Sequence, residues 1–143
     1  MRFSDGYCKL CRVGAIEDME HLLVVCRYNK LIWKTIEDII KEVINQSFKI
    51  DIKTMMLGFA DASYPQNDVL IINMLLSICR YHVWKMRNNI KYGNEDDIGF
   101  VKCKNILNYD LQSHLKLIIH SSQRDIEVNE KLKAVSTAVT GNT

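Results

Sequence analysis

Proline and glycine are scarce in this chain, with one proline and six glycines among 143 residues. Because these residues form tight turns and interrupt regular structure, their scarcity disfavours a fold of many short strands and favours helices. Apolar residues make up 48% of the sequence and charged residues 25%, which is ordinary for a globular protein and outside the disordered range. The length suits one core with a small appendage.

Long apolar stretches are also missing. The longest, Val69 to Cys79, is about half as long as a membrane-spanning helix requires, and residues 1–6 contain no apolar stretch of a secretory signal. We therefore expect an intracellular protein of the nucleus or cytoplasm, with no membrane partner. A net charge of +2 is too small to indicate a nucleic-acid partner, so any such prediction depends on local clustering.

Catalytic motifs are a third absence. The sequence contains no glycine-rich phosphate-binding loop and no nucleophile motif. Its nearest match to the paired carboxylates of metal-dependent nucleotidyl transfer is Phe59-Ala60-Asp61-Ala62, in which alanine replaces the second aspartate. We interpret this match as coincidence, and we expect neither enzymatic activity nor a small-molecule substrate.

Helical periodicity is what the sequence does contain. Apolar residues recur three or four positions apart in three segments, which predicts helices over 29–45, from 67 or 68 to 92, and over 96–120. Within the first of them, Glu37 and Lys41 are spaced for an ion pair. The segment 47–65 is predicted to be a connector that forms a helical turn and folds back across the core.

Four residues near the N-terminus have the spacing of a zinc site. Cys8, Cys11, His21 and Cys26 form the pattern C-x2-C-x9-H-x4-C. Three thiolates and one imidazole suit tetrahedral Zn²⁺, and four protein ligands leave no position for substrate water, so the metal is predicted to be structural. His21 and Cys26 would point about 140° apart on an ideal helix, so the backbone must depart from a straight helix between them.

The other two cysteines, Cys79 and Cys103, lie in helical patterns and are predicted to pack in the core. The predicted fold is all-α, with an N-terminal zinc knuckle (1–30) packed on a bundle of three main helices (31–120). Residues 121–143 lack an obvious apolar stripe and are predicted to form a loose C-terminal tail.

The zinc pattern and its surroundings resemble a known family. CKLC, Glu17 followed by MEHLLVVC, and Trp33 in the next helix are similar to the zinc-binding region that follows the polymerase in non-LTR (LINE-like) retrotransposon reverse transcriptases. Asp18 stands where that family has threonine or serine, and all three can cap a helix. Leu57-Gly58-Phe59 with Ile72-Asn73, and residues 83–87, resemble the helical segment after the motif. The resemblance spans roughly residues 7 to 90, and it implies a noncatalytic region that helps hold template RNA.

Basic residues gather in two places. From residue 77 to 104 there are six lysines and arginines against three acidic residues, which is consistent with a solvated face or with a phosphate-contacting strip. Around the predicted finger, basic side chains are interspersed with tyrosines, a composition that suits single-stranded RNA or DNA. The candidate phosphate contacts are Lys9, Arg12, Arg27, Lys30, Lys34, Arg80, Arg87 and Lys91.

Three interpretations of the chain remain open at this point. The leading hypothesis is a zinc-binding module that binds single-stranded nucleic acid. The alternatives are a zinc-stabilised protein–protein interaction module and a retroelement remnant without a function. A positive surface beside the finger would favour RNA, whereas exposed apolar side chains on the helices would favour a protein partner.

Overall fold

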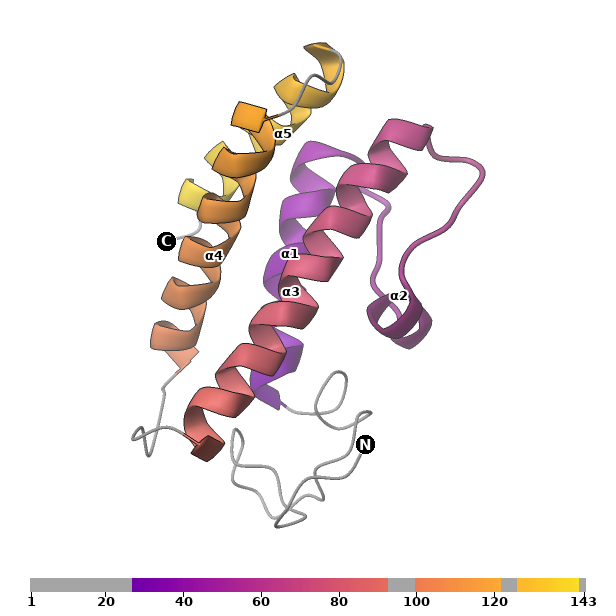
Figure 1. Ribbon diagram of the computed structural model, residues 1–143. Coiled ribbons are helices and arrows are strands. Elements are labelled where there is room, and N and C mark those ends of the chain that lie inside the picture. The colour runs from indigo at the N-terminus through magenta and orange to yellow at the C-terminus, as the bar shows by residue number, and fades with distance from the viewer. Residues whose placement is uncertain (1–26, 93–99, 122–125, 142–143) are drawn as a thin grey trace.

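The computed structural model describes residues 27–92, 100–121 and 126–141, and these residues form helices and their connections without a β-strand (Figure 1). None of the described helices is both long enough and apolar enough to cross a membrane. The five helices are α1 (Arg27–Val43), α2 (Ile52–Leu57), α3 (Gln66–Tyr92), α4 (Phe100–Ser121) and α5 (Ile126–Gly141). The predicted all-α class is therefore confirmed, whereas the predicted knuckle lies outside the described residues.

The four longer helices form an up-and-down bundle. Helix α1 packs on α3 and α5, and α4 completes the ring by packing on α3 and α5. Successive bundle helices run in opposite directions, so α1 begins, α3 ends and α4 begins at one end of the bundle (Figure 1). Short connections join α3 to α4 and α4 to α5, as is usual for antiparallel neighbours, whereas residues 44–65 with α2 form a long connector between α1 and α3.

Helix α1 illustrates why these sequences form a bundle. Its buried residues recur every three or four positions and face α3 and α5, while charged residues occupy the opposite side. The buried set is Ile32, Trp33, Ile36, Ile39 and Ile40. On the other side, the predicted pair of Glu37 and Lys41 is confirmed, with the two groups 3.0 Å apart. Helix α1 begins at Arg27, so residues 27–30 of the predicted knuckle segment form its first turn.

The C-terminal segment differs from its prediction as a loose tail. Helix α5 buries Val128, Leu132, Val135 and Val139 against the bundle. These residues lie at alternating intervals of four and three positions, so they form one continuous stripe. The stripe is narrow and lies among serines, threonines and alanines, which is why periodicity alone did not indicate it. The bundle accordingly has four main helices and not three.

Polar contacts also hold α5 in place. The Gln112 amide donates to the Ser136 carbonyl at 2.8 Å and to the Thr140 hydroxyl at 2.7 Å, and its oxygen accepts from the Ser136 hydroxyl at 2.7 Å. Lys131 forms an ion pair with the buried carboxylate of Asp68 at the start of α3. This contact raises the pKa of the Lys131 ammonium, so the charged form is stabilised in the folded state.

Candidate functional site

The predicted zinc ligands Cys8, Cys11, His21 and Cys26 lie outside the described residues, as do Lys9 and Arg12. Among the residues that are described, no group of three or more His, Cys, Asp or Glu side chains is arranged to hold a metal ion. Helix α1 begins at the residue directly after Cys26. Any site that includes Cys26 is thus joined to the first turn of α1 without a linker.

Lys30 and Lys34 occupy the first two turns of α1, and both are exposed. They lie four residues apart and so project from the same side of the helix. Lys34 pairs with Asp38 at 2.9 Å, and the hydrogen bond to Asp38 raises the pKa of the lysine. Because both partners are more than half exposed, a phosphate can compete for this ammonium at little cost.

Arg80 has a structural role that the sequence did not indicate. Its guanidinium donates to the Met55 carbonyl at 3.0 Å and to the Ser77 hydroxyl at 3.2 Å, which holds α2 against α3. We therefore do not include Arg80 in the candidate interface. Arg87 and Lys91 belong to the last turns of α3, while their side chains, like that of Arg27, lie outside the described part of the structure.

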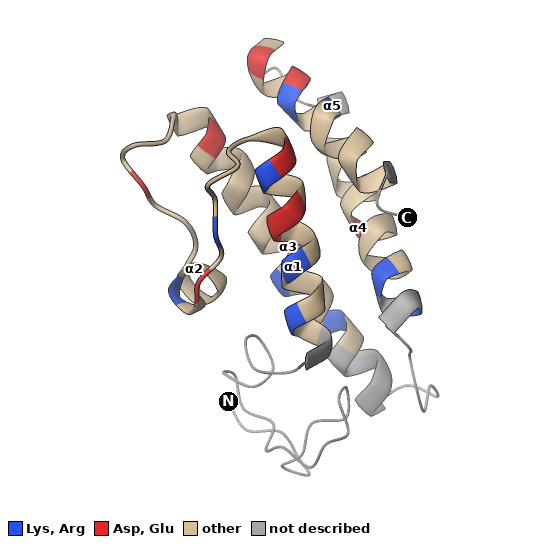
Figure 2. Cartoon of the chain, turned by 180° about the vertical axis from the view of Figure 1, so that it is seen from behind, with Lys and Arg blue, Asp and Glu red and all other residues tan. Residues whose placement is uncertain are grey.

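Charge is unevenly distributed along the bundle (Figure 2). The end where α1 begins, α3 ends and α4 begins carries Lys30, Lys34, Lys85 and Lys102 among its described side chains. Acidic residues are concentrated toward the other end, in the second half of α1 and the first turns of α3 and α5. We call the first region the basic end. It is also the end at which residue 26 joins the bundle.

A buried polar cluster lies between α3 and α4. His82 is 1% exposed, and its Nδ1 lies 3.3 Å from a carboxylate oxygen of Asp110. Asp110 also accepts a hydrogen bond from Lys85 at 3.1 Å, and its backbone carbonyl lies 2.7 Å from Nδ1 of His114. Nothing in the sequence pattern identified Asp110 as the partner of His82. The available signal was a carboxylate on the apolar face of α4, where an unpaired charge would be unfavourable.

The protonation of His82 makes the stability of the protein depend on pH. Burial lowers the pKa of His82 below the ordinary value of 6.5, and this effect outweighs the attraction of Asp110. Because the unfolded chain binds the proton more readily, the free energy of unfolding should decrease as the pH falls below about 6.5. The neutral ring donates from Nδ1 to Asp110, and its Nε2 has no hydrogen-bond partner among the described residues.

We predict that the substitution His82→Gln makes the stability of the protein less dependent on pH. Thermal unfolding midpoints measured at pH 8, 6.5 and 5.5 should fall less steeply with decreasing pH in His82→Gln than in the wild type. Glutamine retains a donor for Asp110 but does not titrate. His114→Gln is the matched control and should follow the wild-type slope more closely. Parallel wild-type and His82→Gln profiles would contradict the prediction.

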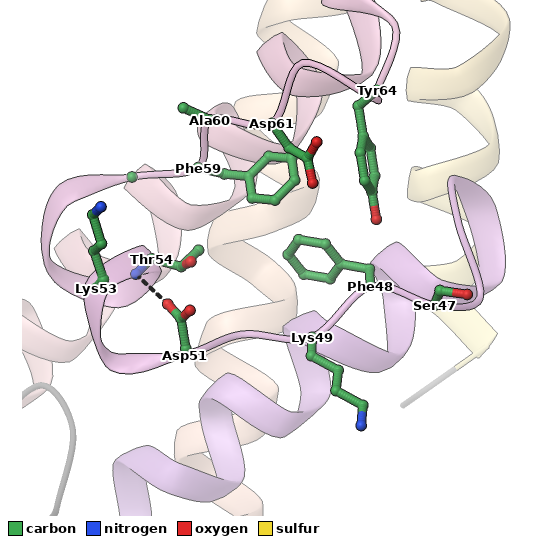
Figure 3. A pocket seen from close by; sticks show the side chains of 11 residues that line it. Ser47, Phe48, Lys49, Asp51, Lys53, Thr54, Phe59, Ala60, Asp61 and Tyr64 are labelled. Atoms are coloured by element: carbon green, nitrogen blue, oxygen red, sulfur yellow. Dashed lines mark hydrogen bonds between the residues drawn. The ribbon is translucent and has the colours of Figure 1, made fainter.

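The connector between α1 and α3 borders a hollow of about 460 Å³ that is partly open to solvent (Figure 3). We call it the connector hollow. Three aromatic rings form one of its walls: Phe59 contacts Phe48 at 5.2 Å and Tyr64 at 4.9 Å between ring centroids, both edge to face. Charged and small residues complete the lining. All eleven lining residues come from this connector: Ser47, Phe48, Lys49, Asp51, Lys53, Thr54, Gly58, Phe59, Ala60, Asp61 and Tyr64.

Asn73 of α3 holds the wall of the hollow in place. Its amide nitrogen donates to the Phe59 carbonyl at 2.9 Å, and its oxygen accepts from the Phe59 N–H at 2.8 Å. Gly58 has φ of +100°, and a Cβ there would lie 3.1 Å from the Asn73 oxygen, so both conformation and space favour glycine. Leu57-Gly58-Phe59 and Ile72-Asn73, two segments of the family resemblance, are thus in direct contact.

Comparisons with known proteins give no family assignment: no protein-family model, curated protein or solved structure matches the chain.

Proposed function

We propose that this chain is a noncatalytic, zinc-binding module that binds single-stranded RNA or DNA and derives from a retroelement reverse transcriptase. In this proposal Cys8, Cys11, His21 and Cys26 hold one structural Zn²⁺. The nucleic acid contacts the finger and the adjoining basic end through Lys9, Arg12, Arg27, Lys30 and Lys34, with Arg87 and Lys91 extending the surface.

The observation that carries this proposal is the position of the basic end. Cys26 is followed directly by α1, whose first two turns expose Lys30 and Lys34. The last turns of α3, which contain Arg87 and Lys91, are at the same end of the bundle. Cationic groups gathered on one surface attract the phosphate backbone, whereas the same number spread over the molecule would not.

Salt-dependent binding tests the proposal. We expect the zinc-loaded protein to bind a single-stranded RNA oligonucleotide in fluorescence anisotropy, with affinity that falls linearly on a double-logarithmic plot against salt. Replacing Lys30 and Lys34 together by glutamine should reduce the slope by about 1.4, since each phosphate contact on a single strand contributes about 0.7. Affinity should fall by a similar factor for different sequences, because phosphates carry no sequence information.

The matched control is Lys116→Gln with Lys133→Gln, which removes the same charge from two exposed lysines of α4 and α5. It should leave the slope nearly unchanged. Absence of binding at low salt, binding without a salt slope, or an equal loss in the control would contradict the proposed interface.

A second candidate function, a protein–protein interaction module, is favoured by α2. This short helix exposes Ile52, Met56 and Leu57, of which Leu57 is 78% exposed. Apolar side chains gathered on one exposed element are typical of contact surfaces. Replacing Leu57 by serine should leave RNA binding unchanged, so loss of a protein partner in that variant would separate this function from the first.

A further inference from the structure

The connector hollow is large enough for a small ligand, and contacts from the bundle hold its walls in place. Its volume of about 460 Å³ falls within the range of small-molecule pockets. Contacts from the bundle fix the connector on both sides: Glu37 of α1 accepts from the Ile50 N–H at 3.1 Å, and Asn73 of α3 holds Phe59. A ligand would therefore meet walls that are already in position, which lowers the entropic cost of binding.

The aromatic wall offers ring surface to a ligand. Phe48 is 1% exposed and supports the wall from beneath, whereas Phe59 and Tyr64 are half-buried. Burial, together with the carboxylates of Asp61 and Asp68, raises the pKa of the Tyr64 hydroxyl, which therefore stays protonated and available as a donor. Partly exposed aromatic rings of this kind are surfaces on which nucleobases stack.

Charged groups of both signs line the same hollow. Lys53 is exposed, and its ammonium group can contact an anion, whereas the Lys49 side chain points away from the aromatic wall (Figure 3). The carboxylate of Asp61 accepts from the hydroxyl and the N–H of Ser63, which lowers its pKa and keeps it ionised. Both bonds use Oδ1, so Oδ2 can accept from the amino or imino group of a base, as carboxylates do with the cytosine amino group.

The balance of these charges separates two classes of ligand. A methylated ammonium ion would also be attracted by aromatic faces and carboxylates, but Lys53 opposes a cation. The same ammonium favours a phosphate. Asp51 already accepts from the Thr54 N–H at the start of α2, so Lys53 and Asp61 are the two opposite charges offered to a ligand, which suits one that combines a donor-bearing ring with an anionic group.

We propose that the connector hollow binds one nucleotide, either free or as a unit of a single strand. The base packs on Phe59 and Tyr64 and donates to Asp61, and the phosphate contacts Lys53. This site is distinct from the basic end, so it goes beyond the proposed function and does not depend on it.

Nuclear magnetic resonance of the full, zinc-loaded chain tests the site. Nucleoside monophosphates titrated to about 10 mM, the range needed for millimolar dissociation constants, should shift backbone amide resonances of residues 47–64 saturably. Inorganic phosphate should shift them less, because it lacks the base. A short RNA that produces the same shifts would identify the ligand as a unit of a strand, and shifts confined to free nucleotides would identify it as free.

Two substitutions test which residues contact the nucleotide. Lys53→Gln and Tyr64→Leu should each weaken nucleotide binding by about fivefold or more, which corresponds to the loss of one contact. Lys133→Gln, an equal charge change on exposed α5, should leave it unchanged, as should the Lys30 and Lys34 substitutions. Thermal unfolding midpoints close to that of the wild type would show that the variants fold.

Three results would overturn the proposal. These are the absence of saturable shifts in residues 47–64 with any nucleotide or RNA, equal affinity in the wild type and both folded variants, and tighter binding of a trimethyl-lysine peptide than of any nucleotide. Because the basic end is tested by other lysines and by the salt slope, failure of the hollow and failure of the proposed RNA interface would be distinguishable.

Discussion

Replacing Leu132 by alanine is expected to lower the free energy of unfolding by about 2 to 5 kcal/mol. Leu132 is fully buried at the centre of the α5 stripe, between Val128 and Val135. Helix α5 packs on both α4 and α1, so the truncation removes apolar contacts with two helices and leaves a cavity that rigid neighbours cannot fill completely. Urea denaturation followed by circular dichroism measures the change.

Lys133→Ala is the control for this prediction, because the neighbouring residue is exposed on the same helix and has similar helix propensity before and after substitution. It should change the free energy of unfolding by less than about 0.5 kcal/mol. If residues 121–143 formed a loose tail, Leu132→Ala would be as harmless as Lys133→Ala. Equal effects of the two substitutions would therefore contradict the docking of α5.

Removing the proposed zinc ion is the second change with a large expected effect. Elemental analysis should find one zinc per wild-type chain and none after Cys26→Ser, because serine cannot supply the thiolate that completes the four-ligand set. Metal binding to such a site is coupled to folding. With free zinc at about a thousand times its dissociation constant, binding would contribute about 4 kcal/mol to stability, and a chelator should abolish that contribution.

Cys79→Ala is the matched control for Cys26→Ser. Cys79 is fully buried in the core, and burial raises the pKa of its thiol, so it stays protonated and apolar at neutral pH. The variant should lose stability but retain the zinc, whereas Cys26→Ser should lose both. A wild-type protein without zinc, or Cys26→Ser with its zinc retained, would contradict the predicted finger.

Local periodicity was sufficient to predict three of the bundle helices. The 29–45 prediction corresponds to α1, and the predicted helix start at residue 67 or 68 lies within the first turn of α3, which begins at Gln66. These segments could be identified because their apolar stripes are broad. Helix α5 could not, since small and hydroxylated residues surround its stripe and only the groove between α4 and α1 makes that stripe a core surface.

The candidate sites also differ in whether the local sequence could indicate them. Ligand types and their spacing are the basis of the zinc prediction, because a metal site requires particular donor atoms, and this site stays a prediction. Local clustering of basic residues placed Arg80 among the candidate phosphate contacts with Arg87 and Lys91, whereas the structure shows that its guanidinium donates to the Met55 carbonyl of α2. The connector hollow had no local signal at all, because its order depends on contacts such as that of Asn73 with Phe59, fourteen residues away.

By itself, then, the sequence determined the helical class, the positions of α1, α3 and α4, and a prediction of four metal ligands, since each of these follows from the chemistry and periodicity of neighbouring residues. Tertiary structure alone decided that α5 completes the bundle, that Asp110 is the partner of His82, and that the connector folds into a hollow. The physical reason is that burial and pairing depend on residues distant in the chain, which become neighbours only when the helices pack.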